Sequence, residues 1–111
     1  MNWYITKLIF QVISGENRQQ AQFDEQLRLI KAADDQQAFS KASRLGNENA
    51  EKLSRADNTS ITWRFINVAE INPVENLTDG AELYYQIHET TEADMYIAHT
   101  NHQAALLQLQ Y

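Results

Sequence analysis

Apolar and polar positions along the first third of the chain follow the pattern that predicts β-strands. Residues 3–13 are rich in β-branched and aromatic side chains, and both the even and the odd positions are largely apolar. A strand with two apolar faces is normally covered on both sides. Residues 23–32 predict a second strand, with Phe23, Leu27 and Leu29 on one face. The polar segment 15–22 predicts a loop longer than two residues, and the short connection predicts an antiparallel hairpin.

The period changes at Asp34, where we expect a helix to begin. Asp34 and Gln37 have the spacing of a capping box, in which side chains satisfy the free amides of a helix N-terminus. Apolar and small residues then recur at helical spacing. The stripe comprises Ala38, Phe39, Ala42, Leu45, Asn49 and Leu53. Gly46 lies inside this pattern, where it either ends the helix or marks a close approach of the helix to the sheet; we favour the close approach.

Two further strands are expected in the second half of the chain. Residues 56–60 predict a loop, and residues 61–71 predict the clearest strand of the protein. Simple alternation places Ile66 and Val68 on one side and, on the other, Ile61, Trp63, Phe65, Asn67, Ala69 and Ile71. Pro73 cannot donate to a ladder, so it ends regular pairing or marks an edge. Residues 77–80 predict a turn, and residues 81–89 predict a fourth strand with Leu83, Tyr85 and Ile87 facing inward.

The segment 91–109 predicts a C-terminal amphipathic helix. Thr91 followed by Asp94 is typical of a helix start. One apolar stripe has helical spacing and comprises Met95, Ala98, His102, Ala105, Leu106 and Leu109. The alternative is that residues 95–98 extend the sheet. No linker or repeat divides the chain, so we expect one α+β domain over residues 1–111, in the order ββαββα, with a four-stranded, mainly antiparallel sheet and its helices packed on one face.

Four segments together resemble a bacterial family known as domain of unknown function 4288. They are Trp3-Tyr4, residues 23–30 (FDEQLRLI), residues 62–68 (TWRFINV) and residues 77–84 (LTDGAELY). The resemblance covers residues 3–90, and the segment after Thr91 departs from it. It implies a small bacterial α+β domain and carries no activity that could be transferred to this chain.

Composition and charge narrow the classes of function. The chain has no cysteine, which excludes a disulfide framework, a thiolate zinc site and a cysteine nucleophile. The net charge of −6 is uneven: residues 1–55 carry eight Lys/Arg and seven Asp/Glu, whereas residues 56–111 carry only Arg64 and eight Asp/Glu. This balance argues against nucleic-acid binding. The acidic half would suit a cationic protein partner or a metal ion, although solubility alone explains such a charge more often. Neither a secretion signal nor a long apolar run is seen, so we expect a cytoplasmic protein without membrane contact.

Few residues suggest chemistry. His99 and His102 would face the same way on a helix and form a candidate metal site, although packed or solvated histidines explain such spacing more often. Asp79 and Glu82 could act as paired carboxylates, but an Asp-Gly dipeptide more simply makes a turn. No phosphate-binding glycine motif is present. We therefore expect no catalytic residue and no cofactor, and the interpretation leans away from an enzyme.

Aromatic residues supply the candidate binding surface. The apolar neighbours of Trp63 and Tyr85 predict that these two rings belong to the core. The candidate binding residues are Tyr4, Arg64, Glu82 and Tyr84, of which Tyr4, Arg64 and Tyr84 are expected at an exposed surface.

Three functions follow from these patterns. The first is a non-enzymatic interaction domain that self-associates as a dimer through the outer sheet face, because an open apolar sheet face needs a cover. The second is an immunity-type inhibitor of a cationic toxin. The third is a small-molecule-binding domain or enzyme with a pocket between the sheet and the C-terminal helix.

Overall fold

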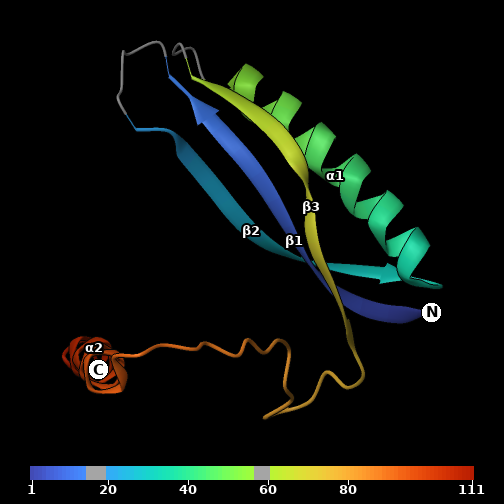
Figure 1. The fold of residues 1–111 in the computed structure, drawn as a ribbon. Coiled ribbons are helices and arrows are strands. Elements are labelled where there is room, and N and C mark those ends of the chain that lie inside the picture. Colours follow the sequence, from blue (N-terminus) through green and yellow to red (C-terminus); the bar gives the residue numbers. More distant parts are fainter. Residues whose placement is uncertain (15–19, 57–60) are drawn as a thin grey trace.

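The computed structural model describes residues 1–14, 20–56 and 61–111 as an α+β fold (Figure 1). Its elements follow the order ββαβα: β1 (Asn2–Ile13), β2 (Gln22–Ala32), α1 (Asp35–Ala56), β3 (Thr62–Val74) and α2 (Ala93–Gln108). The α+β class is confirmed, with three strands and two helices. The loops predicted at 15–22 and 56–60 fall mostly on residues 15–19 and 57–60, which lie outside the described residues.

The three strands form one antiparallel sheet with β1 in the centre, in the order β2-β1-β3. The predicted hairpin of β1 and β2 is confirmed, and its regular register places Ile5 opposite Leu29 and Ile9 opposite Glu25. Because successive side chains of a strand point to opposite faces, the even positions of β1 form one layer and the odd positions another.

Helix α1 covers the even face of the sheet and forms the core with it (Figure 1). Phe10 is fully buried, and its ring lies 5.4 Å from that of Phe65 and 6.5 Å from that of Trp63. The buried residues are Tyr4, Thr6, Leu8, Phe10, Ile30, Ala32, Ala38, Ala42, Ala50 and Val74. Small residues on the buried side of α1 let the helix approach the sheet closely. Phe39 departs from the predicted stripe, since 44% of it is exposed.

The predicted start of α1 and the role of Gly46 are both confirmed. The backbone amide of Gln37 donates to Asp34 Oδ1 at 2.8 Å, and Gln37 Oε1 in turn accepts from the amide of Ala33 at 2.6 Å. This reciprocal pair satisfies two amides near the helix start. Gly46 does not end α1: a Cβ there would lie 2.6 Å from Phe65 Cδ1, so the helix needs a glycine where it crosses the ring.

Strand β3 departs from simple alternation because it contains two register shifts. The pairing with β1 skips Ile66 between Phe65 and Asn67, and it skips Ala69 between Val68 and Glu70. Each skipped residue is an extra one in a bulge. The side chains of β3 packed on the core are therefore Trp63, Phe65, Val68 and Ile71. The prediction that grouped Asn67 and Ala69 with Trp63, and Val68 opposite them, was wrong for this reason.

The chain after β3 forms an arm, residues 75–92, in place of the predicted fourth strand. The predicted turn is present: the amide of Ala81 donates to the carbonyl of Thr78 at 3.0 Å, with Gly80 at φ +85°, a conformation that favours glycine. Residues 81–89 are extended but pair with no described strand. Tyr85 and Ile87 are 73% and 80% exposed, so the prediction that they face inward was wrong.

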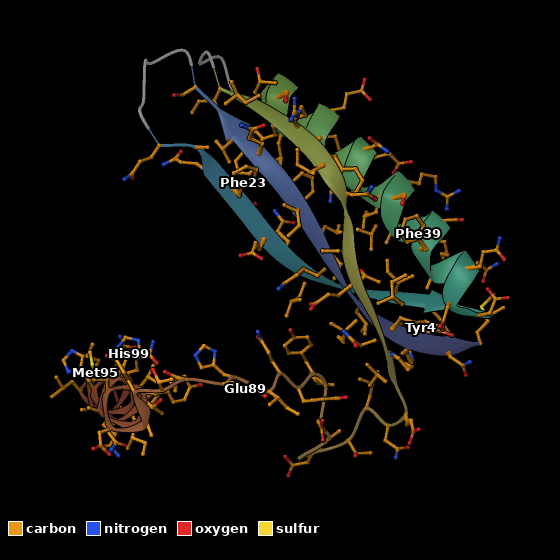
Figure 2. The ribbon with its side chains drawn as sticks, viewed as in Figure 1. Tyr4, Phe23, Phe39, Glu89, Met95 and His99 are labelled. Carbon is orange, nitrogen blue, oxygen red and sulfur yellow. The ribbon has the colours of Figure 1, made fainter. Side chains whose placement is uncertain are left out.

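Helix α2 is present as predicted, but it does not pack on the sheet. None of its residues is buried, and it contacts no other described helix or strand. Figure 2 shows Met95 and His99 on α2, clear of the sheet and of α1. The radius of gyration is 17.7 Å, whereas a compact chain of this length has about 13 Å. The arm and α2 account for this extension.

Candidate interaction surface

The face of the sheet opposite α1 is uncovered, and we call it the open face. It consists of the odd positions of β1 and the residues paired with them on both sides. Its members are Trp3, Ile5, Lys7, Ile9 and Gln11 on β1, Phe23, Glu25, Leu27, Leu29 and Lys31 on β2, and Arg64, Asn67, Glu70 and Asn72 on β3. No described helix lies on it, because α1 is on the other side and α2 stands apart (Figure 1).

The apolar residues of the open face are concentrated on β1 and β2. Phe23, Leu27 and Leu29 are 56%, 54% and 45% exposed, whereas Ile5 and Ile9 of the central strand are half-buried by their neighbours. The sequence places Phe23, Leu27 and Leu29 on one face, and the structure confirms that they share it. Single exposed apolar side chains are ordinary, but several on one face of a sheet are a feature of many interaction sites.

A charged cluster occupies the middle of the open face. Lys7 Nζ lies 3.5 Å from Glu25 Oε1 on β2 and 3.6 Å from Glu70 Oε2 on β3. The hydroxyl of Tyr84 on the arm donates to Glu70 Oε1 at 3.3 Å. Glu70 Oε2 itself is shielded from solvent and accepts no hydrogen bond within the described part of the chain. One lysine thus meets two carboxylates, and the cluster carries a net charge of −1.

The carboxylates keep Lys7 charged. Desolvation by the surrounding side chains acts to lower the pKa of Lys7, but the charges of Glu70 and Glu25 outweigh it, so the pKa is raised above the ordinary 10.5. At one end of the face, Lys31 Nζ lies 5.3 Å from the centre of the Trp3 ring, a cation–π arrangement. Along the central strand of the open face, the ionic cluster at Lys7 is therefore flanked by Ile5 and Ile9.

The four candidate binding residues do not come together. Tyr4 is only 3% exposed and lies in the core, so the expectation that it is at the surface was wrong. It sits on an even position of β1, facing α1 rather than the open face. Arg64 is exposed on the open face opposite Gln11, whereas Glu82 and Tyr84 lie on the arm near Asn72 and Pro73, at the other end of β3.

The histidines do not form a metal site with other ligands in the described residues. His99 and His102 are exposed on α2, and no group of three His, Asp or Glu side chains suited to a metal ion occurs in residues 1–14, 20–56 or 61–111. His88 on the arm instead stacks on Tyr96, with ring centres 4.8 Å apart. This contact joins the end of the arm to the first turn of α2.

Two hollows lie along the arm, and a third of about 420 Å³ lies between residues 1–3 and the end of β3. One of about 350 Å³ is lined by Pro73, Glu75, Asn76, Thr78, Ala81 and Glu82, and another of about 290 Å³ lies beside Tyr84. Asp79 does not line either hollow and belongs to the predicted turn. The predicted pocket between the sheet and the C-terminal helix is not formed, because α2 does not reach the sheet.

The cluster of Lys7, Glu25 and Glu70 was not predicted from the sequence. Lys7 is the single charged residue of a largely apolar strand, and this is the one signal that could have pointed to the cluster. Its two partners come from different strands and are set by the register and by the bulge at Ala69. Neither can be read from local alternation.

The fold is a small α+β domain with a helix on one side of its sheet and no described helix on the other. The family model described as Domain of unknown function (DUF4288) matches residues 3–85, which is most of the chain, and the protein belongs to that family. The matched region contains the sheet, α1 and the arm up to Tyr85, and α2 lies beyond it. Comparisons with curated proteins and with solved structures found no match. Neither described helix is long and apolar enough to cross a membrane.

Proposed function

We propose that this protein is a non-enzymatic interaction module that self-associates through the open face of its sheet. The observation that carries the proposal is an excess of exposed surface. The accessible area is 8902 Å², whereas a compact monomer of this mass exposes about 6,300 Å². The excess is larger than the roughly 800 Å² per partner that a specific protein interface buries.

Exposed apolar side chains lie on the open face, on the arm and on α2. On the open face they include Phe23, Leu27 and Leu29. Burying apolar surface stabilises an association by roughly 25 cal/mol per Å², before the cost of association is subtracted. In a two-fold dimer, the same surface of two identical chains pairs with itself, so only one kind of chain is needed. A second copy of this chain is therefore the simplest partner.

The first test is the solution mass of the full chain by light scattering over a wide range of concentration. We expect a dimer that persists on dilution to the micromolar range. A monomer at every concentration would overturn the proposal.

A matched pair of variants locates the interface. Leu29 on the open face and Phe39 on α1 are 45% and 44% exposed, so a charge at either position disturbs the folded monomer to a similar degree. We expect Leu29→Lys to shift the dimer toward monomer and Phe39→Lys to leave the mass unchanged. Equal effects of the two substitutions would contradict an interface on the open face.

The two other functions stay predictions. For an inhibitor of a cationic protein, Glu75 and Glu82 remain exposed at the hollow by the arm, whereas Glu70 is engaged with Lys7. A charge-reversed Glu75→Lys chain would lose binding to such a partner. For a ligand-binding domain, the hollows along the arm are the places to examine, and thermal shift against metal ions and metabolites is the measurement.

A further inference from the structure

Helix α2 carries two apolar stripes on opposite sides. At about 100° per residue, the residues of the predicted stripe lie on one side, and a second stripe lies half a turn away. The first comprises Met95, Ala98, His102, Ala105, Leu106 and Leu109; the second comprises Ala93, Tyr96, Ile97, Thr100, Ala104 and Leu107. Asp94, Asn101 and Gln108 separate them on one flank, and His99 and Gln103 on the other.

A helix with two opposite apolar stripes can bury both of them only when it lies between two surfaces. An amphipathic helix on the outside of a domain has one stripe, and a helix that is apolar on several sides is buried. In addition, most of the stability of a helix in a protein comes from packing of its apolar face, and α2 contacts no other described helix or strand. One sheet would cover one stripe and leave the other exposed.

The polarity of α2 along its length matches that of the open face. The middle of the helix, residues 99–103, is polar, and apolar turns flank it at 95–98 and 104–107. The centres of these two turns are about 14 Å apart at 1.5 Å per residue. On β1, Ile5 and Ile9 flank Lys7 and are about 13 Å apart at 3.3 Å per residue. A docked helix would set its polar middle over the cluster of Lys7, Glu25 and Glu70.

The cluster has an acceptor for this polar segment. The Glu25 side chain is 61% exposed, and two carboxylates share the single charge of Lys7. The middle of α2 offers His102 in the first stripe and Thr100 in the second stripe as donors. Asp94 is the single charged residue of the helix, so docking would bury no additional unpaired charge from residues 95–108.

We infer that α2 forms a layer between the open faces of two copies of this chain, with one stripe on the sheet of the partner copy and the opposite stripe on its own sheet. The inference rests on the proposed self-association and replaces direct stacking of the two sheets by a sheet–helix–sheet arrangement. It accounts for both stripes of α2 and for both open faces at once.

The arm has the length that this arrangement needs. Tyr84 ties the arm to Glu70 at the open face, and residues 85–92 then span at most about 26 Å in extended form. A helix of about 10 Å diameter between two sheets separates them by about 20 Å, against about 10 Å for sheets stacked directly. The end of the arm therefore reaches a helix placed between the sheets.

Cysteine cross-linking of the full chain tests the arrangement, because the protein has no cysteine of its own. One population carries Leu27→Cys on the open face. A second population, with a different affinity tag, carries Ala98→Cys in the first stripe or Ala104→Cys in the second. Asn101→Cys, on the flank between the stripes, is the control.

The two populations are mixed, dissociated, reassociated and treated with a short bismaleimide. Chains that carry both cysteines are treated in parallel. Circular dichroism checks that each variant is folded.

We expect one stripe to give a cross-linked pair of differently tagged copies and the other stripe to give a cross-link within one chain, each at least fivefold above Asn101→Cys. A stable dimer in which neither stripe cross-links to the partner's Leu27→Cys would overturn the helical layer and leave self-association in place. Cross-links only within single chains in such a dimer would also overturn it. A chain that stays monomeric would overturn both the inference and the proposed function.

Discussion

The two helices of this protein, of 22 and 16 residues, differ in what their residues contact. Helix α1 has small residues on one side, buries Ala38, Ala42 and Ala50 against the sheet, and begins with a capped N-terminus. Helix α2 has apolar residues on two sides and buries none of them. Apolar content therefore does not decide whether a helix packs within its own chain. The width and number of its stripes, and the surface available beside it, decide this.

The largest effect should come from emptying the core under α1. Phe10→Ala removes a fully buried ring that contacts Phe65 and Trp63, and we expect a loss of about 3–5 kcal/mol in the free energy of unfolding. Urea unfolding followed by circular dichroism measures it. Leu107→Ala in α2, measured at a dilution that keeps the chain monomeric, should change the unfolding free energy by less than about 0.5 kcal/mol. Comparable losses in the two variants would break the contrast between the helices.

Gly46→Ala distinguishes packing from helix propensity by the sign of its effect. Propensity alone would stabilise α1 by about 1 kcal/mol. The new Cβ would lie 2.6 Å from Phe65 Cδ1, so we expect a net destabilisation of about 1–3 kcal/mol. Thermal or urea unfolding gives the sign directly. A more stable Gly46→Ala protein would mean that α1 does not approach β3 as closely as described.

Substitutions in α2 should act on association instead of folding. Leu107→Lys places a charge in the second stripe, and we expect it to weaken self-association by at least tenfold, the effect of losing an interface residue worth about 1.4 kcal/mol or more. The dissociation constant from sedimentation equilibrium is the readout. Asn101→Lys, on the polar flank, serves as the control and should leave that constant within about twofold.

The two helix starts offer a smaller contrast. Asp34→Ala removes the side chain that accepts from the amide of Gln37 and should cost about 1 kcal/mol. The residue at the equivalent position of α2, Glu92, makes no side-chain hydrogen bond to the helix. Glu92→Ala should therefore leave the unfolding curve unchanged. If it destabilises the protein as much as Asp34→Ala does, the start of α2 is held by contacts that a free helix lacks.

The smallest effect should come from Lys7, and it should depend on pH. The pKa of Lys7 is raised by Glu70 and Glu25, so the folded state holds this proton more tightly than the unfolded state does. The stabilisation is then fully present below the ordinary pKa of 10.5 and is lost as the pH rises through the higher pKa of the folded state. We expect Lys7→Met to be slightly less stable than the natural chain from pH 7 to 10, and the difference to shrink above that range. A difference that grows above pH 10.5 would contradict the ion pairs.

Much of the fold could be predicted from local patterns. The hairpin, α1 with its start at Asp34, the close approach at Gly46 and the helix at α2 all follow from residue periods and capping residues. The class of fold and the family also agree with the sequence analysis. These features depend on short-range interactions, so they can be read from adjacent residues.

The errors arise where a distant part of the chain decides the outcome. Residues 81–89 alternate like a strand, yet alternation does not supply a hydrogen-bonding neighbour, and the arm leaves the edge of β3 instead of pairing with it. Both faces of β1 are largely apolar, so the sequence does not show which face α1 covers. The burial of Tyr4 depends on this. One apolar stripe with helical spacing is enough to predict a helix, so the prediction for α2 did not include its second stripe. The ionic cluster required the register of all three strands.

The two bulges of β3 have a consequence for how this chain tolerates changes in length. β3 has 13 residues, and its two skipped positions, Ile66 and Ala69, make no pair with β1. Loss of either residue would turn a bulge into regular pairing and keep every remaining side chain on its own layer. The pairing of β1 with β2 is regular and contains no bulge residue. The gain or loss of one residue within β1 would therefore exchange its core and outer sides. We therefore expect single-residue deletions near Ile66 and Ala69, but not within β1, among natural variants of this domain.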